Sequence, residues 1–243
     1  MDLFARTTQL LGTQNMDKIK KAKVAVFGLG AVGSYAMEAL ARTGVGNLKL
    51  VDFDTIDASN INRQLLALNS TIGSKKADLA CERIYDINPE CSINVHNSFI
   101  NAQSLEDLLH QDIDVVVDAI DGLNSKVNLL VKASQMNLAI VSSMGAAGRT
   151  DISMIKTGDI SETQVCPLAR VVRQRLHRRG IYSGIKSVYS IEKPLNKQAY
   201  NSEDAVDPLS NHGRARPPIG SVSWIPGVFG LCIASEVIDI ITC

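Results

Sequence analysis

The chain has 243 residues, of which 45% are hydrophobic and 21% charged, as in an ordinary soluble globular protein with a sizeable core. Lys plus Arg and Asp plus Glu each number 25, so the net charge is zero and gives no information about partners; any basic surface must be local. The five cysteines form no Cys-x-x-Cys pair, which argues against a disulfide framework or a four-cysteine zinc site and favours a reducing, cytoplasmic location.

The first half of the chain alternates short apolar runs with segments of helical periodicity. Residues 1–22 lack the order of a signal peptide and are expected to form a helical arm. Helices are expected at 33–43 (ending at Gly44), from an N-cap at Ser74 to about residue 84, and after a capping box at 104–107. Strands are expected at 23–27, 47–51, 92–96, 115–118 and 138–141. This alternation predicts an α/β fold: a Rossmann-like, mostly parallel sheet with flanking helices, in a nucleotide-binding unit at 23–150 whose sheet ends near Ser143.

The second half, residues 151–243, reads as a C-terminal extension of the same single domain. A strand is expected at 152–155, then a basic amphipathic helix at 167–179. The polar stretch 182–218 predicts a mobile crossover segment. The apolar stretch 221–243 contains Pro226, Glu236 and Asp239, which favours a buried helix or dimer contact over a membrane span.

A glycine-rich loop joins the first strand to the helix after it. Gly28, Gly30 and Gly33 are spaced as Gly-x-Gly-x-x-Gly, with Ala31 and Val32 in the last gap. The glycines permit a tight turn, and the helix amino terminus offers N–H groups to phosphate oxygens. Because the pattern stands between a strand and a helix, it predicts a nucleotide-phosphate site.

The residues after the second strand indicate whether the site binds ATP or a dinucleotide. Asp52 is placed to accept hydrogen bonds from ribose hydroxyls, which an NAD-dependent dehydrogenase would also use. A dinucleotide site, however, needs no cluster of Arg63, Lys76 and Asp121, whereas nucleotidyl transfer uses cations on the α-phosphate and a carboxylate on Mg²⁺.

Five segments together resemble the ubiquitin-activating-enzyme superfamily of adenylating proteins. They are 28–33, 52–54, 60–64, 72–76 and 118–121. The resemblance implies ATP and Mg²⁺ as cofactors, a homodimer, and a monovalent cation (K⁺ or Na⁺) as a candidate further cofactor. It implies that Asp52 binds ribose, Asn60 and Arg63 contact the triphosphate, Lys76 contacts the α-phosphate, and Asp121 holds Mg²⁺. The full set of implied nucleotide-binding residues is Gly28, Gly30, Ala31, Val32, Gly33, Asp52, Asp54, Asn60, Arg63, Gln64, Lys76, Asp118, Ala119, Ile120 and Asp121. In this superfamily the partner subunit also contributes an N-terminal arginine, and Arg6 matches it.

The second half distinguishes branches of that superfamily. Branches that activate ubiquitin-like sulfur carriers usually carry two Cys-x-x-Cys pairs there, and this chain has none. Segments 142–148, 165–173 and 217–226 resemble instead the family of tRNA threonylcarbamoyladenosine dehydratases. The resemblance implies ATP-dependent cyclisation of threonylcarbamoyladenosine beside the tRNA anticodon, through an acyl-adenylate that the same side chain attacks with release of AMP.

Local charge independently indicates an RNA partner. Residues 156–197 contain nine Lys or Arg and three Asp or Glu, although the whole chain is neutral. A local basic zone is what contact with a phosphate backbone requires, although it is also typical of an ordinary solvated helix face. The candidate tRNA-binding residues are Arg170, Arg173, Arg175, Arg178, Arg179 and Lys186.

Cys166 is a candidate nucleophile, because relatives in the superfamily use a cysteine to receive the activated acyl group. It precedes Pro167 near a helix start, which favours a thiolate, but the cyclisation needs no thioester, so packing is the stronger interpretation.

Three alternative functions remain open from the residues. One is adenylation of the C-terminus of a ubiquitin-like sulfur-carrier protein, and another is an NAD-dependent dehydrogenase. The third is a non-catalytic nucleotide-sensing scaffold or a partner in sulfur relay.

Overall fold

The computed structural model describes residues 3–195 and 219–243. The part of the predicted crossover that lies at 196–218 is therefore outside the described residues. The helices are α1 (Ala5–Leu11), α2 (Thr13–Lys21), α3 (Gly33–Thr43), α4 (Lys76–Ile87), α5 (Ser104–Leu108), α6 (Leu123–Gln135), α7 (Pro167–His177) and α8 (Trp224–Thr242). The strands are β1 (Lys23–Phe27), β2 (Asn47–Val51), β3 (Ser92–His96), β4 (Val115–Asp118), β5 (Ala139–Ser143), β6 (Ile155–Asp159) and β7 (Lys186–Ser190).

One seven-stranded sheet organises the molecule, in the order β3-β2-β1-β4-β5-β7-β6. Every neighbouring pair is parallel except β6 with β7, which is antiparallel. This confirms the predicted Rossmann-like, mostly parallel α/β fold. The strand order reverses between β1 and β4, and α/β sheets bind ligands at the carboxyl edge beside such a reversal.

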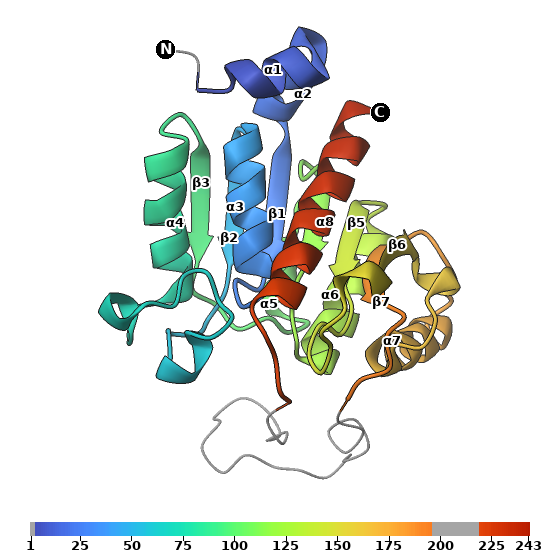
Figure 1. Cartoon of the computed structure of the whole chain (residues 1–243). Helices are drawn as coiled ribbons and strands as arrows, with labels where there is room; N and C mark the ends of the chain where they lie inside the picture. The colour runs from blue at the N-terminus through green and yellow to red at the C-terminus, as the bar shows by residue number, and fades with distance from the viewer. Residues whose placement is uncertain (1–2, 196–218) are drawn as a thin grey trace.

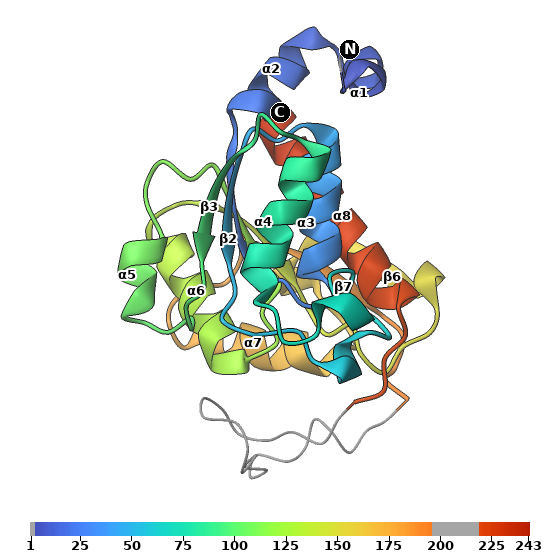
Figure 2. The same cartoon turned by 90° about the vertical axis from the view of Figure 1, so that its left-hand side faces the viewer.

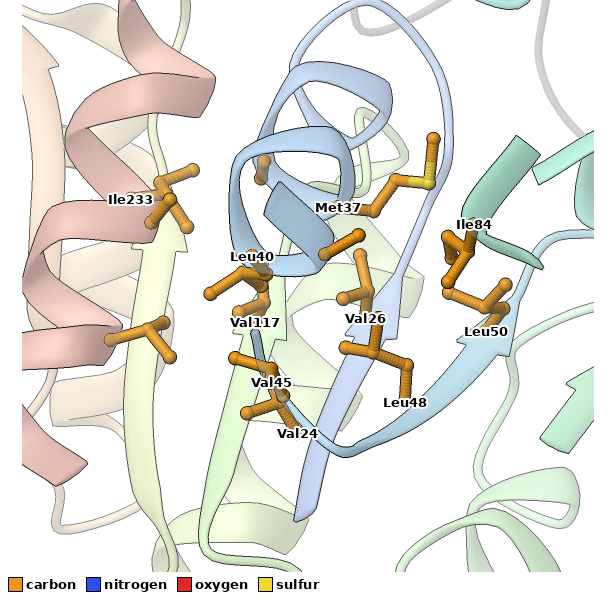
Figure 3. Close-up of a cluster of buried hydrophobic side chains, with 14 of the residues drawn as sticks. Val24, Val26, Met37, Leu40, Val45, Leu48, Leu50, Ile84, Val117 and Ile233 are labelled. Carbon is orange, nitrogen blue, oxygen red and sulfur yellow. The ribbon is translucent and has the colours of Figure 1, made fainter. Parts of the chain in front are cut away.

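Helices cover both faces of the sheet (Figures 1 and 2). Helices α3, α4 and α8 pack on one face and contribute to a core that contains Met37, Leu40 and Ile84. Figure 3 shows these side chains meeting Val24, Val26 and Val117 of the sheet, with Ile233 of α8 beside them. Helices α5, α6 and α7 cover the other face.

The terminal helix α8 is a packed element of this core. It is long and apolar enough to cross a membrane by length and composition, but half of its most apolar window is buried within the protein. It lies against α3 so closely that a Cβ on Gly230 would fall 2.6 Å from the carbonyl oxygen of Val32. Pro226 is tolerated because the first helical turn needs no N–H donors. The predicted buried helix fits this packing better than a span.

Four local predictions were wrong. The sheet does not end near Ser143, because β7 forms within the predicted crossover and bears the buried residues Val188 and Tyr189. Residues 152–154 form a 3₁₀ turn whose start is fixed by the Asp151 side chain, and the strand begins only at Ile155. The other two wrong predictions are the helix caps expected at Ser74 and Ser104.

Neither predicted cap is a cap in the structure. Helix α4 begins at Lys76 with Lys75 as its unassisted N-cap, two residues after the expected position of Ser74, and it continues to Ile87. Ser104 is the first residue of α5 rather than its cap, and its hydroxyl donates 2.9 Å to the Phe99 carbonyl. The Lys76 N–H at the start of α4 donates to the distant Asp54 carbonyl, and the first N–H groups of α5 donate to Asn101 of the preceding loop; sequence periodicity reveals neither.

Candidate active site

The carboxyl ends of β1, β2, β4 and β5 lie at one edge of the sheet, and the glycine loop follows β1 there. Gly28 has φ +88°, and a Cβ on it would fall 2.8 Å from the Ala119 carbonyl oxygen. A Cβ on Gly33 would fall 1.8 Å from the Gly28 carbonyl oxygen, so the fold itself requires both glycines. At Gly30 a Cβ would meet only the Gln64 Nε2, at 3.8 Å, among the described residues. The middle glycine therefore leaves open space beside the loop, where a ligand can approach the backbone.

Asp52 connects the second strand to this loop. Its two carboxylate oxygens accept from the backbone N–H groups of Leu29, at 2.6 Å, and Asp54, at 2.8 Å. Burial raises the pKa of Asp52, while the charge of Lys76 and the two N–H groups act in the opposite direction. Each oxygen retains a lone pair, so the carboxylate can still accept from a ligand hydroxyl.

Lys76 is a buried cation next to that carboxylate. It is 5% exposed, and its Nζ lies 2.8 Å from Asp54, whose side chain is 46% exposed. The two charges are also joined through the backbone, because the Lys76 N–H donates to the Asp54 carbonyl. Because the Asp54 carboxylate is partly exposed, a phosphate that approaches from its open side can compete with it for the Lys76 ammonium.

Arg63 and Asn60 lie on the arm that follows β2. The Arg63 Nη1 donates to the Ser59 carbonyl at 2.7 Å and to the Asn62 side chain at 2.9 Å, and the other guanidinium nitrogens donate to no acceptor among the described residues. The Asn60 oxygen accepts from the Asp57 N–H and closes a short 3₁₀ turn. Gln64 is buried, and its Oε1 has no hydrogen-bond partner within residues 3–195 and 219–243. The arm thus presents cationic and amide groups beside the glycine loop.

Asp118, predicted to bind nucleotide, lies in the core instead. Its carboxylate is fully buried and contacts the Lys126 Nζ at 2.6 Å, the Ser142 hydroxyl at 2.6 Å and the Ile120 N–H at 3.1 Å. These contacts leave little capacity for a ligand and fix the loop after β4. Sequence analysis missed Lys126, whose only signal is a charged residue on the apolar face of a helix.

Asp121 is the exposed carboxylate at the end of that loop. No group of three or more His, Cys, Asp or Glu able to hold a metal is found among the described residues. A single carboxylate beside nucleotide phosphates is nevertheless a common way to hold Mg²⁺, whose other ligands are water and phosphate oxygens.

Arg6 lies far from its own glycine loop. It is an exposed residue of α1, and α1 and α2 sit beyond the amino ends of the strands, at the opposite end of the sheet (Figure 1). A Cβ on Gly44, at the amino edge, would lie 3.2 Å from Phe4 and Met16 of this arm. Arg6 is thus not brought together with the other predicted site residues of its own chain.

The predicted basic helix is α7, and its arginines have different roles. Arg173 is half-buried and donates to the Thr163 carbonyl and hydroxyl at 2.8 and 2.6 Å. Arg175 donates to Asn124 at 2.6 Å. Arg170, Arg178 and Arg179 are exposed, whereas Lys186 pairs with Glu236 of α8 on the other face of the sheet. The structure therefore separates Lys186 from the arginines.

Cys166 is the N-cap of α7 and is only 2% exposed. It lines a cavity of about 330 Å³ together with Val165, Arg170 and Arg173. Val165 has φ 63°, and the Cys166 N–H donates to the Gln164 carbonyl at 2.6 Å across this strained turn. Neither Lys76 nor the glycine loop lines the cavity.

The chain matches known proteins over nearly its whole length. The model described as "ThiF family" matches residues 4–243. A tRNA threonylcarbamoyladenosine dehydratase from Bacillus subtilis (strain 168) is 37% identical, over 97% of this chain and 92% of that protein. The dehydratase from Haemophilus influenzae is 34% identical over the same shares. Molybdopterin-synthase adenylyltransferase from the same organism is 33% identical over only 56% of this chain.

A solved structure of a dehydratase is also similar to this chain. The crystal structure of E. coli tRNA N6-threonylcarbamoyladenosine dehydratase in complex with ATP has a TM-score of 0.86 and 30% identity, and the match covers 98% of this chain and 93% of that one. A complex of the same protein with AMP has the same TM-score.

Proposed function

Because this chain belongs to the ThiF family, we propose that it is an ATP-dependent tRNA threonylcarbamoyladenosine dehydratase. The observation that carries the proposal is the buried Lys76 beside Asp52 at the glycine loop, in a chain that matches the dehydratases of Bacillus subtilis and Haemophilus influenzae over 92% of their length. The family adenylates acyl groups, and a lysine at this place is suited to the charge that develops on the α-phosphate.

The reaction follows from the chemistry of a carboxylate, which expels oxide poorly. The side-chain carboxylate of the modified adenosine attacks the α-phosphorus of ATP and displaces pyrophosphate. An atom of the same side chain then attacks the acyl carbon, the ring closes, and AMP leaves with the former carboxylate oxygen. The nucleoside loses the elements of one water, and no protein nucleophile is required, so Cys166 is assigned to packing beside α7.

We assign roles to the chain's own residues on the positions described above. Gly28, Gly30 and Gly33 admit the phosphates, and Asp52 accepts from ribose. Arg63 and Lys76 offset the charge of the phosphates, with Asn60 and Gln64 as neutral donors. Mg²⁺ would be held by Asp121 with ATP and would offset triphosphate charge. A monovalent cation stays a proposal without an assigned site.

We also propose one adenylation domain over 1–243, because β6, β7 and α8 share the sheet and core of the first half. A cytoplasmic location is consistent with the free cysteines of the described residues. A sulfur-relay protein stays a candidate partner.

The direct test is to incubate the protein with ATP, Mg²⁺ and tRNA from a strain that lacks the activity. AMP should form only with that tRNA, and the modified adenosine should lose the mass of one water. AMP that depends on a small sulfur-carrier protein would favour the alternative adenylyltransferase. Nicotinamide binding would favour a dehydrogenase, and ATP binding with no AMP would favour a scaffold.

Gly30→Ala should weaken ATP binding while leaving the fold intact. The added methyl group meets almost no protein atom, so the free energy of unfolding should change by less than about 1 kcal/mol. It fills the space in which phosphate approaches the backbone, so the Kd for ATP should rise by about tenfold or more. The matched variant Gly33→Ala should unfold the protein, because its Cβ overlaps the Gly28 carbonyl. Unchanged ATP affinity in Gly30→Ala would place the triphosphate elsewhere.

We propose that α7 and the turn that follows it contact tRNA through the exposed arginines Arg170, Arg178 and Arg179. Beside them Tyr182 is 62% exposed and its ring lies 5.1 Å from that of His177, so that aromatic faces adjoin the cations. Arg173 and Arg175 orient the helix and its loop rather than facing solvent freely.

Arg170→Glu combined with Arg178→Glu should lower tRNA affinity and its dependence on salt. Two lost phosphate contacts should reduce the slope of log K against log salt by about two and the affinity at least about tenfold. Lys20→Glu with Lys21→Glu is the control, since these exposed lysines lie at the other end of the sheet. Equal losses in both double variants would indicate a general charge effect rather than a site on α7.

Arg6 is proposed to serve the active site of the partner subunit in a homodimer, because it lies at the wrong end of its own sheet. Arg6→Ala and Lys76→Ala should each be inactive. After subunits exchange, a mixture of the two should recover about a quarter of the parental AMP formation, since mixed dimers contain one intact site. A mixture that stays inactive would rule out sharing of the site.

A further inference from the structure

Arg149 is a buried arginine that the proposed chemistry does not use. Its side chain is only 2% exposed and is the largest fully buried side chain in the described structure. Its Nη1 donates to the Ala147 carbonyl at 2.9 Å, while Nε and Nη2 have no hydrogen-bond partner among the described residues. No carboxylate of the described residues lies within ion-pair distance of it. A buried charge in this condition costs several kcal/mol unless a counter-ion compensates it.

The two unpaired nitrogens are the pair that binds oxyanions best. Nε–H and one Nη2–H point along the same edge of the guanidinium plane and match two oxygens of one carboxylate or phosphate. The remaining nitrogen, Nη1, is anchored to the backbone and fixes the orientation of that edge. The contact that Arg149 makes therefore leaves its bidentate edge available.

The loop that carries Arg149 belongs to the same edge of the sheet as the glycine loop. It follows β5, which is parallel to β4 and one strand beyond the β1–β4 reversal. The Gly148 N–H donates to the Gly220 carbonyl at 2.8 Å, and the next residue, Ser221, accepts from Asn62 at 3.1 Å. Residues 220–221 thus join the loop of Arg149 to the arm of Arg63.

We propose that the Nε–Nη2 edge of Arg149 binds an oxyanion at the active site. The proposal rests on the proposed function for the identity of that ion, which is either the carboxylate of the modified nucleoside or a phosphate of ATP. The carboxylate is favoured by position, because β5 lies two inter-strand spacings of about 4.8 Å each from β1, where the glycine loop takes the phosphates. The test separates the two sources.

The first experiment needs no turnover, so a wrong assignment of the reaction would leave it valid. The thermal midpoint of the full chain is measured in sodium acetate and in sodium phosphate against sodium chloride of equal ionic strength, with and without saturating ATP. At ten times its Kd either anion should raise Tm by about 3 °C. Arg149→Met and Arg149→Lys should both lose this rise, since neither has a planar two-donor edge. In chloride, Arg149→Met should melt no lower than the parent, because it removes an uncompensated buried charge.

A lower melting temperature of Arg149→Met in chloride would show that the arginine is structural and would overturn the proposal. A rise in Tm that persists in both variants would place the anion elsewhere and would also overturn it.

The second experiment identifies the ion with Arg149→Lys. Loss of a charge-assisted bidentate contact should change one binding constant by about ten- to a hundredfold. A higher KM for tRNA with an unchanged Kd for ATP assigns the carboxylate, and a higher Kd for ATP assigns a phosphate. If neither constant changes, the edge binds no ligand of the reaction and the proposal fails.

Discussion

Arg63→Gln should lower the rate of AMP formation by about 10²- to 10³-fold, which is the usual effect of removing one group that stabilises transition-state charge. Within the described part of the chain, the guanidinium is held by one nitrogen only, through the Ser59 carbonyl and the Asn62 side chain. Its remaining donors can therefore reach the triphosphate without breaking the arm. Glutamine keeps a polar group of moderate length but has no charge, so the loss measures the cation rather than the packing.

Steady-state AMP release and ATP binding distinguish the possible outcomes for Arg63. A fall in kcat with little change in the Kd for ATP indicates that the arginine acts mainly in the transition state. The control is Arg42→Gln, an exposed arginine paired with Glu38 on α3, which should keep the parental rate. Unchanged AMP formation in Arg63→Gln would contradict the assignment and would revive the dinucleotide interpretation of the glycine loop.

The strands that build the site could be predicted because local pattern and tertiary role agree in them. Residues 24–27 and 115–117 are continuous apolar runs, and they lie in buried central strands that end at the active edge. The glycine loop was predictable for a related reason, since Gly28 and Gly33 are required by contacts between neighbouring elements. The glycine pattern is visible in the sequence because no larger residue fits at these two positions.

β7 could not be predicted in the same way. Its residues Lys-Ser-Val-Tyr-Ser look polar, yet Ser187 and Ser190 are buried because the strand lies between β5 and β6. That position depends on strands far away in the sequence, and local composition does not contain it. The extent of the sheet was therefore underestimated.

The partners of charged side chains in the site could not be predicted from the sequence either. Asp118 and Asp121 look alike in the sequence, but the first is sealed in the core and the second is exposed. The difference arises from Lys126, which meets Asp118 only after α6 packs on the sheet. Arg149 shows the opposite case: an arginine that looks like a surface residue in a loop is fully buried. Pairing and burial of charges depend on tertiary packing, which no spacing of residues predicts.

Lys126→Met should destabilise the protein by about 3–5 kcal/mol, because it leaves the Asp118 carboxylate buried without its cation. Both side chains of this pair are 0% exposed, and the Nζ also donates to the Ser143 carbonyl at 2.9 Å. The loss should appear as a lower midpoint in urea denaturation with an unchanged m-value. Lys132→Met on the same helix is the control, since its pair with Glu106 is exposed and should cost less than about 1 kcal/mol.

The double variant Lys126→Met with Asp118→Asn separates the charge from the packing. Asparagine carries no charge; its Oδ1 can still accept from the Ile120 N–H, and its Nδ2 can donate to the Ser142 hydroxyl, which then acts as acceptor, so the double variant should recover most of the lost stability. Equal destabilisation of the single and double variants would mean that the methylene chain of Lys126, not its charge, maintains the core. Because the carboxylate also fixes the loop whose Ala119 carbonyl lies against Gly28, Lys126→Met should weaken ATP binding together with stability, and the double variant should restore both.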